Sequence, residues 1–184
     1  MRTYLILLGL SALLALSACG NAGVHEHTHA NAETGDGHDT HHHHGSGELP
    51  AGLTEADNPR YPVGSSVTIR TDHMPGMNGA AATVSGAFHT TVYAVSYEPK
   101  NGGARVTDHE WVVHEELKDP GSEPLAVGAK ATLEADHMEG MRGAEATIDS
   151  AERTTVYLVD YVPTTGGEPV TNHMWVVESE LSDD

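Results

Sequence analysis

From residue 57 onward, hydrophobic and polar positions alternate over short stretches, a pattern typical of half-buried β-strands. The segment Thr90–Tyr97 is β-branched and aromatic, and it alternates with a period of two. Other apolar stretches predict strands at Val67–Arg70, Ala80–Val84 and Glu110–Val113, separated by a glycine-rich loop at 72–79 and a turn at 99–103. Since no stretch keeps a helical period over three turns, we expect an all-β fold.

The whole pattern occurs twice. A shift of 64 residues aligns 61–119 with 125–183 without a gap, and 31 of the 59 aligned pairs are identical. This tandem duplication predicts two copies of one module. About five short strands in roughly 60 residues are typical of a small SH3-like barrel, in which closure removes exposed strand edges. We therefore expect two tandem SH3-like barrels, at 57–120 and 121–184; the alternative is one β-sandwich in which the two copies pair intimately.

The amino terminus has the pattern of an export signal. Met1 and Arg2 precede an apolar run at 4–18, which is shorter than the roughly 20 apolar residues that a membrane-spanning helix needs. The run ends in Leu-Ser-Ala-Cys, which resembles the lipobox of bacterial lipoproteins, and the alternative is an ordinary secretory signal. We expect residues 1–18 to be removed and Cys19 to be lipidated. The protein is then anchored in the cell membrane on its extracytoplasmic face.

Residues 19–56 join this cysteine to the first module. They offer almost nothing that could build a core, so we expect a disordered tether. Segment 20–56 contains eight histidines, and histidine-rich tracts are typical of metal binding, with copper, zinc or nickel as suitable ions. The alternative is a polar spacer that is histidine-rich by accident. The candidate ligands in the tether are His25, His27, His29, His41, His42, His43 and His44.

Composition narrows the range of partners. The chain has 9 Lys and Arg against 27 Asp and Glu, a formal charge of −18 at pH 7. Such a surface repels phosphate backbones, so we expect no nucleic-acid binding and regard cations as the natural ligands. The single cysteine excludes an intramolecular disulfide, a cysteine-rich zinc site and an iron–sulfur cluster.

The repeats carry histidine beside methionine in polar, glycine-rich sequence. An imidazole next to a thioether is a soft ligand pair that selects copper, above all Cu(I). In the first copy we expect His73 to share one ion with Met74 or Met77, and His109 of the same copy to complete the site. The second copy repeats this set as His137, Met138, Met141 and His173. The alternative is a turn whose methionines plug one end of the core.

The motifs Asp-His-Met-x-Gly-Met-x-Gly-Ala-x-Ala-Thr and His-x-Trp-Val-Val, each present twice behind a lipobox, resemble those of the YdhK-like lipoproteins. That family carries a tandem domain of unknown function, and some members are linked with copper tolerance in Gram-positive bacteria. The resemblance covers about residues 57–184 and implies a ligand role for the eight repeat residues named above. In the His-x-Trp-Val-Val motif many members have Lys between the histidine and the tryptophan, where this chain has Glu110 in the first copy and Met174 in the second.

The leading hypothesis is a monomeric, envelope-tethered copper sink or chaperone, with copper export or oxidation proteins as expected partners. The alternative is an SH3-like interaction module that binds a cell-wall or envelope protein partner without metal, through a groove formed by Tyr93, Tyr97 and Trp111. We find no nucleophile with a paired base, no phosphate-binding loop and no open zinc hydrolase site, so we do not expect an enzyme.

Overall fold

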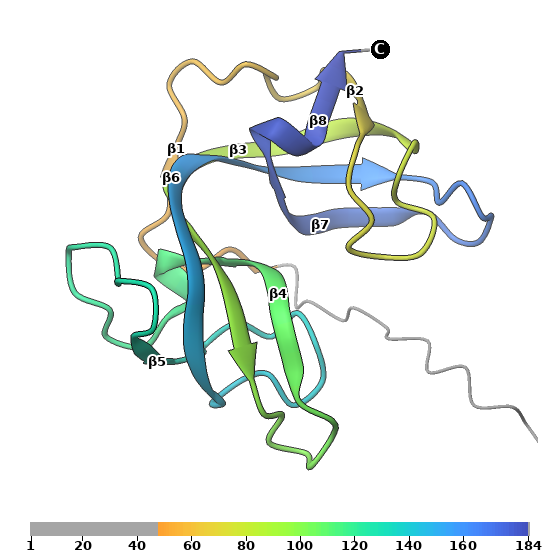
Figure 1. Ribbon diagram of the computed structural model, residues 1–184. Helices are drawn as coiled ribbons and strands as arrows, with labels where there is room; N and C mark the ends of the chain where they lie inside the picture. Colours follow the sequence, from red (N-terminus) through yellow and green to blue (C-terminus); the bar gives the residue numbers. More distant parts are fainter. Residues whose placement is uncertain (1–47, 184) are drawn as a thin grey trace, which may run out of the picture. The chain divides into compact units, whose positions relative to one another are not determined.

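The computed structural model describes residues 48–183, which form β-strands joined by turns (Figure 1). The strands are β1 (Thr54–Glu55), β2 (Ser66–Ile69), β3 (Ala81–Tyr97), β4 (Val106–Val113), β5 (Lys130–Thr132), β6 (Glu145–Tyr161), β7 (Val170–Val177) and β8 (Leu181–Asp183). The helical elements among these residues are two single turns of 3-10 helix, η1 (His114–Glu116) and η2 (Glu178–Glu180). The all-β prediction is confirmed.

Several predictions concern residues outside the described range. The export signal, Cys19 and all seven candidate ligands of the tether lie before residue 48. Within residues 48–183, no helix has the length and apolar character needed to cross a membrane.

Strands β3 and β6 join the two repeats. They pair antiparallel along nearly their whole length, from Ala82 opposite Tyr161 to Tyr97 opposite Ala146 (Figure 1). Near the middle, Thr90 pairs with Thr154, its own equivalent at the 64-residue shift. The two repeats are therefore related by an approximate two-fold axis through this pair. Since the residues between the two predicted strands at 80–84 and 90–97 also pair with β6, the structure has one continuous strand there.

The shorter strands pair with opposite ends of this central ribbon. Strand β2 pairs with the first residues of β3, and β4 pairs with its last residues. Strands β5 and β7 flank β6 in the same way, and β8 pairs with β2. All these pairings are antiparallel and belong to one eight-stranded sheet.

Each half of the sheet encloses a hydrophobic core drawn from both repeats. We call them lobe 1, whose core comprises buried residues from 61–87 and 157–181, and lobe 2, whose core comprises residues from 93–117 and 133–148. The structure does not confirm two separate barrels at 57–120 and 121–184. The physical reason is that each repeat spreads its long strand across both lobes, so its apolar face is buried only when the other repeat supplies the missing strands.

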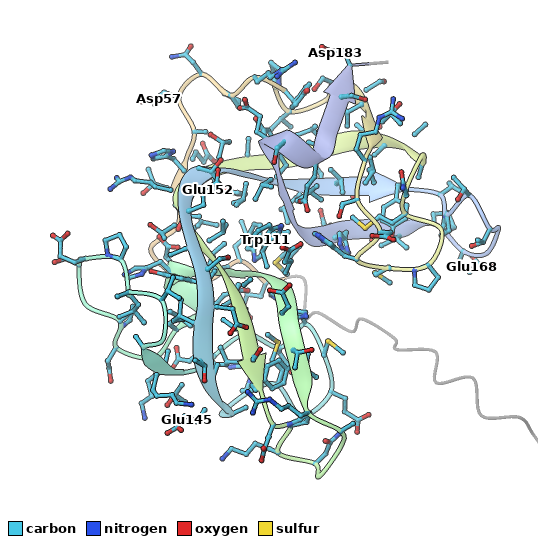
Figure 2. The ribbon with its side chains drawn as sticks, in the orientation of Figure 1. Asp57, Trp111, Glu145, Glu152, Glu168 and Asp183 are labelled. Carbon is cyan, nitrogen blue, oxygen red and sulfur yellow. The ribbon has the colours of Figure 1, made fainter. Side chains whose placement is uncertain are left out.

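A third group of buried residues lies where β4 and β7 meet the middle of the ribbon. It comprises Phe88, Val92, Val113, Val156, Leu158, Trp175 and Val177, with Trp111 and Met174 packed against it at its edge. Trp111 lies between the two lobes in Figure 2. At this junction Trp111 of β4 contacts His73, which lies in the loop of the first histidine–methionine motif, with ring centroids 6.5 Å apart.

Candidate metal-binding sites

Each histidine–methionine loop is held by a turn of the opposite repeat. In lobe 1, the backbone N–H of Thr164 donates to the carbonyl oxygen of Gly76 at 2.8 Å. A Cβ atom on Gly76 would come within 2.5 Å of the Thr165 hydroxyl, and φ is +80°, so only glycine fits this close approach. In lobe 2, the N–H of Lys100 donates to the carbonyl of Gly140, also at 2.8 Å. Both loops thus lie in a fixed position against the other repeat.

The first methionine of each motif has a tyrosine hydroxyl directed at its sulfur. Tyr161 donates to Sδ of Met74 and Tyr97 donates to Sδ of Met138, each at 3.7 Å. Burial raises the pKa of Tyr97 to about 12 and raises the pKa of Tyr161, so both phenols stay protonated as hydrogen-bond donors. A thioether that accepts one hydrogen bond keeps a second lone pair, so each sulfur is oriented and still able to bind a soft ion.

The second methionine of each motif lies in the core. Met77 and Met141 are fully buried, in lobe 1 and lobe 2 respectively. A local turn fixes the backbone of Met77: its N–H donates to the carbonyl of Met74, and its carbonyl accepts from the N–H of Ala80. For these two residues, the placement favours the alternative in which methionine fills one end of the core.

The histidine two residues before the tryptophan of each repeat, His109 or His173, lies in the lobe of the other repeat's motif. The rings of His109 and His137 have centroids 6.0 Å apart, and the edge of His109 also faces Tyr97 at 6.2 Å. In lobe 1, His173 makes the equivalent edge contact with Tyr161 at 5.9 Å. The structure therefore brings together the predicted types of residue, but it combines the His-Met pair of one copy with His109 or His173 of the other copy. The sequence predicted that His109 would complete the site of its own copy, whereas in the structure it contacts His137 of the second copy.

A cluster of three possible ligands surrounds His73 in lobe 1. Its Nε2 lies 2.8 Å from Oε1 of Glu180 and 3.5 Å from Oε2 of Glu110. One ligand atom from each of the three residues lies within 4.8 Å of the others. His73 is mostly buried, and neither Nδ1 nor Nε2 has a hydrogen-bond partner of good geometry, so its short contacts with the two carboxylates are ion-pair contacts.

The two carboxylates of this cluster have opposite pKa shifts. Burial by itself would raise the pKa of Glu180, but the short contact with His73 and its charge, followed by the N–H groups of Val177 and Trp111, lower it below its ordinary value. Burial raises the pKa of Glu110; His73 opposes this effect, and the charge of Glu180 adds to it. The partners of Glu180 thus stabilise its charged form, whereas burial disfavours the charged form of Glu110.

A glutamate that binds both histidine and tryptophan occurs in each lobe. In lobe 1, Oε2 of Glu180 accepts from Trp111 Nε1 at 3.1 Å and from the Val177 N–H at 2.9 Å. In lobe 2, Glu116 accepts three hydrogen bonds: from His137 Nε2 at 2.6 Å, from Trp175 Nε1 at 3.0 Å and from the Val113 N–H at 3.0 Å.

The two lobes differ at one position beside these glutamates. Met174 occupies the place in lobe 2 that Glu110 occupies in lobe 1. It lines a cavity of about 350 Å³ that also contains His137 and Glu116. Among the remaining lining residues, four are acidic and one is basic: Glu48, Leu49, Pro50, Ala51, Glu115, Glu134, Ala135, Asp136 and Arg142. A cavity with this charge suits a cation.

Sequence reasoning missed Glu110, Glu116 and Glu180. Glu116 and Glu180 are identical at the 64-residue shift, five residues after the tryptophan of each copy, and this was the available signal. This repeated glutamate did not stand out, because carboxylates are common in this acidic chain whereas histidines next to methionines are rare.

The fold and these sites define a class: a duplicated all-β protein whose lobes gather imidazole, thioether and carboxylate groups. The family described as "Protein of unknown function (DUF1541)" matches residues 63–114 and 127–178, one match in each repeat, and the chain belongs to this family. The internal repeat and the resemblance to YdhK-like proteins are thereby confirmed.

A curated relative and solved structures are similar to this chain. The "Uncharacterized protein YdhK" of Bacillus subtilis (strain 168) is 55% identical over 177 residues, which cover 96% of this chain and 86% of the relative. The crystal structure of ydhK from the same organism is 59% identical, covers 74% of this chain and 93% of its own, and has a TM-score of 0.73. The solution NMR structure of the ydhK C-terminal domain is 61% identical, covers 66% and 92%, and has a TM-score of 0.64.

Proposed function

We propose that this protein is an envelope-tethered lipoprotein that binds copper and serves as a copper sink or chaperone. The observation that carries the proposal is the contact between the His109 and His137 rings in lobe 2, where the Tyr97 ring that faces His109 donates its hydroxyl to the sulfur of Met138. Met74, His73 and His173 are the equivalent residues of lobe 1. In this proposal copper is the cargo that the protein holds or passes on.

The residues of lobe 2 fit a copper ion. Imidazole nitrogens bind such ions at about 2.0 Å, so two rings on one ion have centroids no more than about 6 Å apart. The observed separation of the rings of His109 and His137 is 6.0 Å. The thioether of Met138 adds a soft donor, which favours Cu(I) over zinc, calcium or magnesium.

The surroundings agree with a cation-binding role. The acidic cavity next to His137 and the formal charge of −18 concentrate cations near the site. In this proposal the tether histidines bind further copper, and a lipid on Cys19 anchors the protein to the extracytoplasmic face of the cell membrane, where copper export or oxidation proteins are the partners.

The rival interaction module requires an exposed aromatic groove. Tyr93 and Tyr97 are buried, as are Tyr157 and Trp175 of the second repeat. Trp111 is half-buried and donates its N–H to Glu180. Because these rings pack in the core or bind Glu180, they do not form an exposed groove for a protein partner. The metal-binding hypothesis is therefore better supported than the interaction module.

The test is Cu(I) competition against a chromophoric chelator. The protein is the mature chain with the eight tether histidines replaced by asparagine, so that they do not mask the repeats. The double variant Met74→Leu/Met138→Leu should lose Cu(I) binding, because leucine keeps the volume and removes the donor. The matched control is Met77→Leu/Met141→Leu, the same exchange at core positions, which should keep it. Unchanged Cu(I) affinity in the first variant would refute the proposal.

A further inference from the structure

The most informative difference between the two repeats lies beside the tryptophans. His73 and His137, Glu180 and Glu116, and Trp111 and Trp175 are equivalent pairs, and in each lobe the glutamate lies at ion-pair distance from the histidine and accepts a hydrogen bond from the tryptophan. The exception is Glu110 in lobe 1, which is Met174 in lobe 2. One lobe therefore has two carboxylates around its histidine, and the other has one carboxylate and a thioether nearby.

The spacing of the lobe 1 ligands suits a metal ion. Ligands bound at about 2.1 Å in tetrahedral geometry lie about 3.4 Å from one another. The separations from His73 Nε2 are 2.8 Å to Glu180 and 3.5 Å to Glu110. The atoms are close enough to share one ion after modest adjustment, and His73 would lose its Nε2 proton when the ion binds.

One ligand is fixed and another is accessible. The N–H groups of Trp111 and Val177 hold Oε2 of Glu180, which leaves Oε1 directed at His73. Such supporting hydrogen bonds are a regular feature of metal sites. The side chain of Glu110 is 36% exposed, so an ion can reach the cluster from solvent.

Charge and ligand type define the class of ion. Two carboxylates with one imidazole give N,O,O donors without sulfur, which suit borderline divalent ions such as Zn²⁺ or Cu²⁺. Calcium requires six to eight oxygen ligands, and Cu(I) favours softer donors.

We propose that His73, Glu110 and Glu180 form a site for a borderline divalent cation in lobe 1, and that Met174 denies lobe 2 the equivalent site. The site shares His73 with the lobe 1 set proposed for Cu(I), whereas Glu110 and Glu180 belong to neither histidine–methionine set. Lobe 1 thus offers ligands for a divalent ion in addition to its Met74 thioether, and lobe 2 has a second thioether, Met174, in place of Glu110.

Reciprocal exchange between the repeats tests this proposal. Zn²⁺ is titrated by calorimetry into the mature chain whose eight tether histidines are asparagine, and into the same chain carrying Glu110→Met, Glu110→Gln or Met174→Glu. Circular dichroism checks the fold of each variant, and the NMR signals of the His73 ring report whether zinc binds there. Cu(I) competition is measured in parallel.

We expect both Glu110 variants to bind Zn²⁺ at least about tenfold more weakly, since even supporting residues of metal sites contribute that much. Met174→Glu should gain a second Zn²⁺ equivalent, and zinc should shift the His73 signals in the parent chain. Zinc affinity equal to that of the parent in both folded Glu110 variants would overturn the proposal. Since Cu(I) binding depends on Met74 and Met138, its loss or persistence judges the proposed function separately.

Discussion

Replacing Glu116 by alanine should destabilise the protein more than the same change at Glu180, its equivalent in lobe 1. The Glu116 carboxylate is 7% exposed and accepts hydrogen bonds from His137, Trp175 and the Val113 N–H. Its removal leaves three buried donors without an acceptor, and truncating one partner of a buried ion pair costs about 3–5 kcal/mol. A domain of this size has a total stability of about 5–15 kcal/mol, so the loss is a large fraction.

The expected cost at Glu180 is smaller, about 1–3 kcal/mol. Its carboxylate is 13% exposed, and its tryptophan partner, Trp111, is only half-buried. Glu110 also remains as a second partner for His73 after the change. The two variants therefore compare one chemical change in two environments within one chain.

The assay is urea denaturation followed by tryptophan fluorescence, with the free energy of unfolding extrapolated to water. Glu134→Ala is the control, because Glu134 lines the same cavity as Glu116 but is exposed, and it should change stability by less than about 0.5 kcal/mol. Equal losses for Glu116→Ala and Glu180→Ala, or a loss at Glu116 no larger than the control, would refute the reasoning.

Three further predictions follow from burial and from the amino-terminal pattern. Burial raises the pKa of Tyr97 and Tyr157 from 10.0 to about 12, so between these pH values the folded protein retains protons that the unfolded chain releases. The free energy of unfolding should therefore fall as pH rises from about 10 to 12, and absorbance at 295 nm should show no ionisation of these two phenols near pH 10. Met141→Ala should cost about 2–5 kcal/mol in urea denaturation and Met141→Leu less than about 1.5 kcal/mol; equal midpoints for the two would contradict a core role. Cys19→Ser should abolish labelling by a fatty-acid probe and release the protein from membranes, whereas equal labelling of both forms would exclude lipidation.

The strands could be predicted from sequence because their signals are local. Alternation and β-branched residues identified Thr90–Tyr97, and glycines identified the loop at 72–79. The assembly of the repeats could not be predicted, because the sequence of a long strand with two apolar halves does not show which strands pair with each half. Thr90 pairs with its own equivalent, Thr154, only because two identical long strands can align antiparallel, and this contact is remote in sequence.

The same limit applies to the sites. The motif identified His73, Met74, His137 and Met138 as chemically unusual, and the structure directs tyrosine hydroxyls at both sulfurs. It could not identify which histidine completes each lobe, because His109 reaches His137 only through the exchange of strands between repeats. The glutamates were missed for a related reason, as Glu180 contacts His73 from a distance of more than 100 residues along the chain.

The most direct test of the account is to locate copper in crystals grown with Cu(I) under reducing conditions, using anomalous scattering at the copper edge. The account predicts a peak in lobe 2 bounded by His109, His137 and Met138, which come from two different repeats. Copper that is bound elsewhere, with these three side chains unchanged and uncoordinated, would contradict it.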